Sequence, residues 1–213
     1  MEILVKQVSK SLGKRQVLKE INFEARSGEI VGIIGRNGSG KSVFFKCLVG
    51  LFQPNSGEIW IGGEKISPKS RLGSRVGMII EQPGFLPQYS GYRNLKILAA
   101  LQGRAGKKEI EESLKAVGLY EERNKQVGKY SMGMKQRLAL AQAMMEDPPV
   151  LILDEPMNGL DKKGVEEMRR LLGEMRERRK LILMASHNKE DIELLCDRVY
   201  EMDAGEISLK ING

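Results

Sequence analysis

The chain has 213 residues, 41% of them hydrophobic and 30% charged, which provides enough apolar material for a hydrophobic core and excludes global disorder. No apolar run approaches the roughly 18–20 residues of a transmembrane helix, and the mixed charge at the N-terminus argues against a secretory signal, so we expect a cytoplasmic protein. The net charge of +7 permits a polyanionic ligand, whereas an aromatic content of 5% argues against a stacking surface for single-stranded nucleic acid.

The first half of the chain predicts a series of strands around one glycine-rich loop. Alternating apolar and polar residues, or short apolar runs, predict strands over residues 3–8, 17–23, 29–34, 58–61 and 76–80. The third strand leads into the glycine-rich loop and then into a helix over 42–51, and a loop rich in glycine and proline covers 82–87. That third strand is apolar throughout, which is typical of a strand covered on both faces.

The second half alternates helices with wholly apolar strands. Helical spacing occurs over residues 94–101, 108–117, 131–145, 164–178 and 189–196, and apolar strands are expected over 150–154 and 181–186. This alternation indicates a largely parallel sheet with helices on both faces. The helical stretch 92–147 interrupts the pattern, so we expect an α/β fold with an inserted α-helical subdomain.

The loop over residues 35–42 fits the pattern G-x-x-x-x-G-K-[ST] between a strand and a helix. Its glycines let the backbone wrap closely around an anion, and the helix that follows adds the positive end of its dipole. The lysine supplies charge for the β- and γ-phosphates, and the last serine can ligate Mg²⁺. The residues predicted to bind nucleotide phosphates are Gly35, Arg36, Asn37, Gly38, Ser39, Gly40, Lys41 and Ser42. The alternative is a glycine-rich turn with an incidental lysine.

Chemically active side chains follow both apolar strands of the second half. Asp154 and Glu155 stand at the C-terminal end of the first, where open α/β sheets bind ligands. We expect Asp154 to hold Mg²⁺ and Glu155 to take a proton from an attacking water. His187, the single histidine, follows the second strand and is expected at the same sheet edge, near the γ-phosphate. The alternatives are a turn-capping Asp154, a surface Glu155 and a structural His187.

In their order along the whole chain, these motifs resemble the ATP-binding subunits of ABC (ATP-binding cassette) transporters. Residues 35–42 resemble the Walker A motif, 150–155 the Walker B motif with its catalytic glutamate, and His187 the switch histidine. Asn-Gly-Leu-Asp over 158–161 resembles the D-loop. Tyr-Ser-Met-Gly-Met-Lys-Gln-Arg over 130–137 resembles the signature segment, usually written LSGGQ, and similar S-x-G-M-K-Q-R segments occur in subunits that resemble bacitracin- and lantibiotic-resistance exporters.

The resemblance implies a P-loop NTPase core with a mostly parallel sheet and an N-terminal antiparallel β part. Residues 1–213 would form one ATP-binding domain. Its catalytic core would cover residues 1–91 and 148–213, and a helical subdomain with the signature segment would cover about 92–147.

The resemblance also implies ATP and Mg²⁺ as cofactors, and ATP hydrolysis coupled to transport, with export as the expected direction. Two cassettes, identical or related, would meet head to tail, so that Ser131 and Gly133 of one reach the nucleotide bound by the other. Asp161 of the D-loop would belong to the same set of nucleotide-binding residues. A separate transmembrane permease would supply the pathway and hold the cassette at the inner face of the cell membrane.

Several residues depart from the usual family pattern. Met132 and Met134 replace the Gly and Gln of the signature, although the serine and the helix N-terminus can still meet a phosphate. Glu81 stands where the family has a glutamine, in a register preferred over Gln82, and its carboxylate is expected to ligate Mg²⁺ and contact the nucleotide. Leu12 replaces the aromatic residue that usually stacks on adenine, so we expect weak ATP affinity and loose base selectivity.

The loop before residue 92 predicts a docking surface for the permease. Phe85, Leu86 and Tyr89 are unusually apolar for a loop and would receive a cytoplasmic helix of the transmembrane subunit. The alternative is a small satellite cluster of the core.

Other functions built on a phosphate loop fit the sequence less well. A cassette ATPase that acts on ribosomes or DNA would be expected to carry a second cassette or long insertions, and a kinase or switch NTPase would leave the helical stretch and the signature segment unexplained. A cassette that binds ATP without hydrolysing it is disfavoured because both Glu155 and His187 are present.

Overall fold

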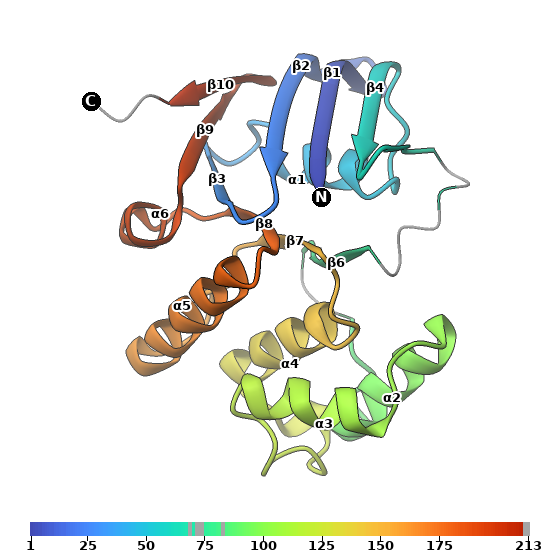
Figure 1. Ribbon diagram of the computed structural model, residues 1–213, viewed down its shortest axis with the longest axis vertical. Helices are drawn as coiled ribbons and strands as arrows, with labels where there is room; N and C mark the ends of the chain where they lie inside the picture. Colours follow the sequence, from blue (N-terminus) through green and yellow to red (C-terminus); the bar gives the residue numbers. More distant parts are fainter. Residues whose placement is uncertain (68–69, 71–74, 82–83, 211–213) are drawn as a thin grey trace.

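The computed structural model describes residues 1–67, 70, 75–81 and 84–210, and Figure 1 shows two sheets with a group of helices below them. The antiparallel sheet has the order β2-β1-β4-β5, and the larger sheet has the order β10-β9-β3-β8-β7-β6. The strands of the antiparallel sheet are β1 (Glu2–Leu12), β2 (Arg15–Arg26), β4 (Ser56–Ile61) and β5 (Glu64–Lys65). Those of the larger sheet are β3 (Ile30–Ile34), β6 (Val76–Ile79), β7 (Val150–Asp154), β8 (Leu181–Ala185), β9 (Arg198–Asp203) and β10 (Glu206–Lys210).

Helices occupy the connections between the strands of the larger sheet. They are α1 (Lys41–Leu48), α2 (Gly91–Gln102), α3 (Lys107–Ala116), α4 (Met132–Met144), α5 (Lys162–Glu177) and α6 (Lys189–Leu195), with a short 3₁₀ turn, η2 (Val127–Lys129). Helices α2, α3 and α4 lie between β6 and β7 in the chain and gather at one end of the molecule (Figure 1). None of the helices that the structure describes has both the length and the apolar character of a membrane span.

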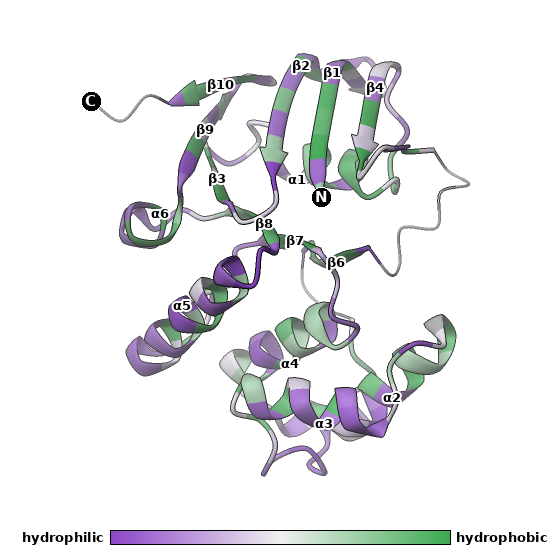
Figure 2. Cartoon of the chain, in the orientation of Figure 1, coloured by the Kyte–Doolittle hydropathy of each residue, from purple (hydrophilic) through white to green (hydrophobic). Residues whose placement is uncertain are grey.

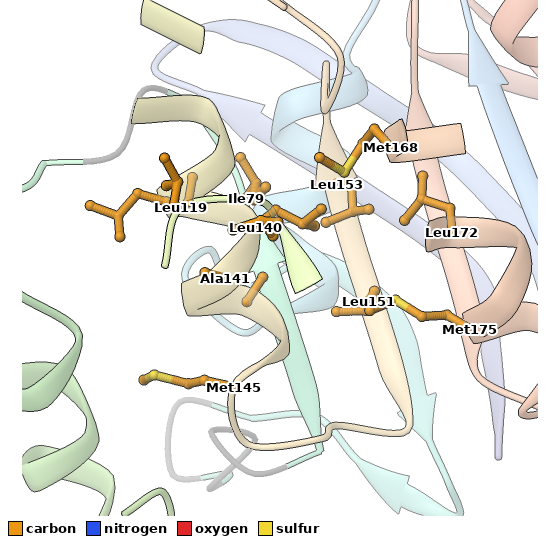
Figure 3. Close-up of a cluster of buried hydrophobic side chains, with 14 of the residues drawn as sticks. Ile79, Leu119, Leu140, Ala141, Met145, Leu151, Leu153, Met168, Leu172 and Met175 are labelled. Carbon is orange, nitrogen blue, oxygen red and sulfur yellow. The ribbon is translucent and has the colours of Figure 1, made fainter. Parts of the chain in front are cut away.

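Two hydrophobic clusters cover the two faces of the larger sheet. Val150 and Ile152 of β7 belong to the first cluster, which joins this sheet to the antiparallel sheet and α1. Leu151 and Leu153 belong to the second cluster, which joins the opposite face to helices α2 to α5. Figure 3 shows both leucines among side chains of this cluster from α4 and α5. Because successive side chains of a strand point to opposite faces, a strand buried on both sides must be apolar at every position. Helix α5, in contrast, has a hydrophilic outer face, as Figure 2 shows.

The structure confirms the predicted α/β fold with a parallel core, an antiparallel N-terminal sheet and helices inserted between β6 and β7. The β1–β2 hairpin extends further than predicted, since its pairing continues until Leu12 faces Arg15. Strands β9 and β10 are absent from the prediction. They form an antiparallel hairpin through Ala204 and Gly205, whose positive φ angles of 45° and 85° suit a tight two-residue turn.

Candidate nucleotide-binding site

Ten of the predicted site residues meet around a cavity of about 540 Å³ at the C-terminal ends of the parallel strands. Its walls come from the phosphate loop and α1, from the segments after β7 and β8, and from the tip of the β1–β2 hairpin. The predicted residues that line it are Leu12, Asn37, Gly38, Gly40, Lys41, Ser42, Glu81, Asp154, Glu155 and His187. This is the place where open parallel sheets bind ligands.

The phosphate loop also contains Gly35, Arg36 and Ser39, which do not line the cavity. Two of its glycines have backbone conformations that favour glycine. Gly35 has φ +150° and Gly40 has φ +119°. A Cβ atom on Gly35 would lie 2.2 Å from the carbonyl oxygen of Met202, so only glycine fits. Gly40 is the N-cap of α1, and no described side chain caps this helix end. The first-turn N–H groups of α1 are therefore available to an anion.

Lys41 is held inside this loop with its ammonium group already oriented. Its Nζ atom donates hydrogen bonds to the carbonyl oxygens of Gly35, at 2.7 Å, and of Arg36, at 3.1 Å. Only 7% of the residue is exposed. Burial lowers the pKa of the ammonium group, although Asp154 and Glu155 oppose this shift by favouring the charged form. A phosphate that entered the loop would meet a positive charge that is poorly solvated and fixed in place.

Ser42 and Asp154 bring a hydroxyl group and a carboxylate together. Ser42 Oγ donates a hydrogen bond of 2.9 Å to Asp154 Oδ2, which ties α1 to the end of β7. Within the described residues, no three His, Cys, Asp or Glu side chains form a metal site of their own. A hydroxyl and one carboxylate nevertheless suit Mg²⁺, which usually keeps water and substrate phosphate oxygens as its remaining ligands.

Glu81 lines the same cavity, but its carboxylate already has a partner. Its Oε1 atom lies 2.5 Å from the Nζ atom of Lys46 on α1. The backbone of Glu81 has φ +64°, a conformation that residues other than glycine rarely adopt. The alternative in that register, Gln82, lies outside the described residues.

Glu155 and His187, which follow β7 and β8, lie close together in the wall of the cavity. His187 Nε2 lies 3.4 Å from Glu155 Oε1, and the His187 backbone N–H approaches Glu155 Oε2 at 3.5 Å. Within the described residues, Oε1 is buried and accepts no hydrogen bond. Burial raises the pKa of the Glu155 carboxyl, and the nearby His187 opposes that shift. A carboxylate with a raised pKa and a vacant acceptor is suited to accept a proton from water.

Because the pKa of Glu155 is raised in the folded chain, we expect its ionisation to lower the free energy of unfolding as the pH rises. The unfolded chain ionises this carboxyl near its ordinary value of 4.5, whereas the folded chain resists ionisation. Stability is therefore lost as the pH rises from below 4.5 through the folded pKa. We expect Glu155→Gln to raise the unfolding temperature at neutral pH, and this gain should shrink below pH 4.5, where the carboxyl is protonated in both states. Thermal unfolding of both proteins across this pH range measures the difference, and a gain that did not vary with pH would contradict the explanation.

Residues 18–158, from β2 through the phosphate loop to the segment after Glu155, match the family model described as ABC transporter. The chain belongs to the ABC transporter family. The predicted enzyme class is thereby confirmed, and this ABC cassette is an ATP hydrolase coupled to transport.

Two named relatives support the predicted resemblance to a subgroup of ABC cassettes. The bacitracin transport ATP-binding protein BcrA of Enterococcus faecalis is 39% identical over 212 residues, which cover 99% of this chain and 69% of the relative. The lantibiotic transport ATP-binding protein SrtF of Streptococcus pyogenes is 34% identical over 206 residues, which cover 97% of this chain and 89% of the relative. The resemblance of this cassette to bacitracin and lantibiotic transport subunits is therefore confirmed.

A solved ABC cassette has nearly the same fold. The dimeric MJ0796 cassette, in a post-hydrolysis state bound to ADP and Pi, superposes with a TM-score of 0.89 at 26% identity, covering 99% of both chains. The predicted use of a nucleotide agrees with this similarity.

The N-terminal part of the signature segment of this ABC cassette lies apart from the cavity. Ser131 caps α4, where its side chain accepts a hydrogen bond of 3.2 Å from the Met134 N–H. A Cβ atom on Gly133 would lie 2.8 Å from the carbonyl oxygen of Gly159, and Met132 is 63% exposed. Asp161 likewise caps α5 through a 2.9 Å hydrogen bond from the Gly164 N–H. In the described part of a single chain, Ser131, Gly133 and Asp161 line no part of the cavity.

The cassette places further residues at the site that the sequence prediction did not include. Arg15 lines the cavity beside Leu12. Gln136 also lines it, and its Nε2 atom donates to the carbonyl oxygens of Glu155, at 3.1 Å, and Pro156, at 3.0 Å. The position of Gln136 in the K-Q-R end of the signature segment is a sequence signal that could have indicated a role, whereas Arg15 carries none.

The loop that holds His187 is fixed by a buried ion pair. Asp191 of α6 accepts hydrogen bonds of 2.8 and 2.6 Å from Arg169 of α5. Its other oxygen lies 3.5 Å from Ser186 Oγ, which in turn accepts a 3.1 Å hydrogen bond from the Asn188 N–H. The residues on both sides of His187 are therefore anchored to α5, which limits the positions that the imidazole can take.

Proposed function

We propose that this cassette is the ATP-hydrolysing subunit of an ABC exporter and that it works through a separate transmembrane permease. The observation that carries this proposal is the convergence of Lys41, Ser42, Asp154, Glu155 and His187 on one cavity. The direction rests on the similarity to subunits named for bacitracin and lantibiotic transport. Residues 1–91 and 148–213 act as the catalytic core, and 92–147 as a helical subdomain.

Within the cavity, each side chain has a distinct role toward MgATP. The loop amides and the Lys41 ammonium bind the β- and γ-phosphates. Ser42 and Asp154 would hold Mg²⁺, with Glu81 as a further oxygen ligand, and a bound ion would supply charge neutralisation at the phosphates. Glu155 takes a proton from the attacking water, and His187 contacts the γ-phosphate. These roles agree with the burial of Lys41 and with the vacant acceptor on Glu155.

A second cassette, identical or related, completes the site. Ser131 and Gly133 lie at the N-terminal end of α4, outside the cavity of their own chain, and Asp161 lies at the start of α5. We infer that they face the nucleotide of a partner cassette, where the α4 N-terminus adds its positive dipole end. The dimeric state of the similar MJ0796 cassette supports this arrangement.

A groove between the larger sheet and the helical subdomain suits the permease. Its volume is about 340 Å³, and Phe85, Leu86 and Ile97 contribute apolar side chains to it. Tyr89 is not among the described residues that line it, since its ring faces the Arg93 guanidinium at 4.2 Å. An exposed apolar groove of this kind suits a helix of a membrane subunit, and it would hold the cassette at the inner face of the membrane.

The hydrolysis rate as a function of protein concentration tests the proposed subunit. If two cassettes form each site, phosphate release in MgATP should rise faster than linearly with protein concentration, and sizing in ATP should detect a dimer. A rate strictly proportional to concentration, with a monomer at every concentration, would contradict the paired site. Direction is tested with inverted membrane vesicles from the native cells, using labelled bacitracin: ATP-dependent uptake supports export, and ATP-dependent loss contradicts it.

Replacing Leu12 with an aromatic residue is expected to raise the affinity for ATP. Its aliphatic side chain lines the open end of the cavity, where an aromatic ring would add about 0.5–1.5 kcal/mol of stacking. We expect Leu12→Tyr to tighten ATP binding about 2- to 13-fold, measured by equilibrium titration with ATP and GTP, with the larger gain for ATP. Leu209→Tyr, the same change at an exposed leucine on β10, is the control and should have no effect. Equal affinities for Leu12→Tyr and the unmodified chain would contradict the assignment of Leu12 to the base.

A further inference from the structure

Helix α1 presents two polar side chains, four residues apart, to the ends of two neighbouring strands. Ser42 and Lys46 share one face of the helix, as residues at i and i+4 do. Ser42 contacts Asp154 at the end of β7, and Lys46 contacts Glu81 shortly after β6, the strand that pairs with β7. The second contact thus repeats the first at the adjacent strand, with an ammonium group in place of a hydroxyl.

Lys46 is the anchored member of its pair. Its side chain is 21% exposed, and its Nζ atom lies 5.3 Å from the centroid of the Phe52 ring, a cation–π distance. The side chain of Glu81 is 64% exposed. Glu81 lines both the nucleotide cavity and the neighbouring groove, whereas Lys46 lines the groove. Lys46 therefore holds Glu81 between the nucleotide cavity and the neighbouring groove.

The charge balance of the cavity explains why Glu81 needs such a partner. Asp154 and Glu155 already place two carboxylates in it, against the ammonium of Lys41. A third, unpaired carboxylate would repel a triphosphate bound in the same cavity. With Lys46 beside it, Glu81 presents hydrogen-bond acceptors to the cavity with little net charge.

We propose that Lys46 is a positioning residue that acts through Glu81, neutralising this carboxylate so that a nucleoside triphosphate can bind beside it. The inference rests on the proposed nucleotide site. It differs from a merely structural role, because a partly exposed ion pair that only joined two elements would contribute little to folding and would leave nucleotide affinity unchanged.

A double-mutant cycle tests the coupling between the two residues. We expect Lys46→Met to weaken binding of Mg²⁺ and AMP-PNP, a non-hydrolysable ATP analogue, about three- to tenfold, measured by isothermal titration calorimetry. Lys46→Met/Glu81→Gln should bind more tightly than Lys46→Met and within about twofold of Glu81→Gln alone, because neither of these two variants carries the unpaired charge. The defect of Lys46→Met should also shrink at high salt, which screens the repulsion.

Lys10→Met is the matched control. Lys10 Nζ lies 5.8 Å from the same Phe52 ring and donates to the carbonyl oxygen of Gln53, but it makes no described contact with Glu81. The control should bind AMP-PNP normally. Normal binding by Lys46→Met, or a double variant as weak as Lys46→Met, would overturn the inference. An unmodified chain that failed to bind AMP-PNP would instead overturn the proposed nucleotide site. If Lys46→Met does not fold, Lys46→Gln takes its place in the cycle.

Discussion

Replacing Glu155 with glutamine is expected to lower kcat for ATP hydrolysis about 10²- to 10⁴-fold while ATP binding is retained. The amide has nearly the same shape as the carboxylate, but it cannot take the proton of the attacking water. Glu155 Oε1 is buried and accepts no hydrogen bond from the described residues, so this acceptor is kept open for a ligand. Steady-state phosphate release gives the rate, and a titration with ATP gives the affinity.

Glu121→Gln serves as the control for Glu155→Gln, because Glu121 is an exposed glutamate that does not line the cavity. It should hydrolyse ATP at the unmodified rate. Glu155→Gln should also elute as a dimer in MgATP, since a cassette pair that cannot hydrolyse its nucleotide cannot reopen. A kcat within tenfold of the unmodified chain would show that another group accepts the proton.

Replacing Lys41 with methionine is expected to weaken ATP binding about 10²-fold, from the loss of charge-assisted hydrogen bonds to phosphate. Methionine keeps the unbranched apolar stem that is buried under the loop, so the change isolates the ammonium group. This group donates hydrogen bonds to the carbonyl oxygens of Gly35 and Arg36, and a phosphate would compete for the same donor. Calorimetric titration with ATP measures the loss.

Lys129→Met is the control for Lys41→Met, since Lys129 is an exposed lysine in the η2 turn. Its affinity for ATP should match that of the unmodified chain. Because burial lowers the pKa of Lys41, its ammonium group is disfavoured in the folded state, and Lys41→Met is expected to fold. A folded Lys41→Met variant with unchanged ATP affinity would contradict the assigned phosphate site.

The fold could be predicted wherever local sequence and burial agree. Strands β3, β7 and β8 are wholly apolar because both of their faces are covered, and such runs are visible without a structure. Strand β10 could not be found in this way, because it lies at the edge of the sheet and most of its residues are exposed. An edge strand depends on pairing with its neighbour, which leaves little hydrophobic pattern.

Some residues of the candidate site could likewise be predicted from the sequence, and others could not. The phosphate loop, Asp154, Glu155 and His187 could be predicted because each belongs to a short motif next to an apolar strand. The partners of these residues could not, since they are distant in the chain. Lys46 looks like any helical lysine until β6 brings Glu81 beside it, and the ion pair that fixes the His187 loop joins two different helices.

Helix α4 gives the proposed pair of cassettes a mechanical link. Its N-cap Ser131 is proposed to face the partner's nucleotide, while Gln136 on the same helix holds the carbonyl oxygens of Glu155 and Pro156 in its own site. Only about 7.5 Å of rigid helix separates these positions. A shift of α4 after phosphate leaves the partner's site would therefore pull on the backbone that carries Glu155. We therefore expect hydrolysis of the two ATP molecules of a pair to be coupled, because Gln136 links the backbone of Glu155 to the helix proposed to contact the partner's nucleotide.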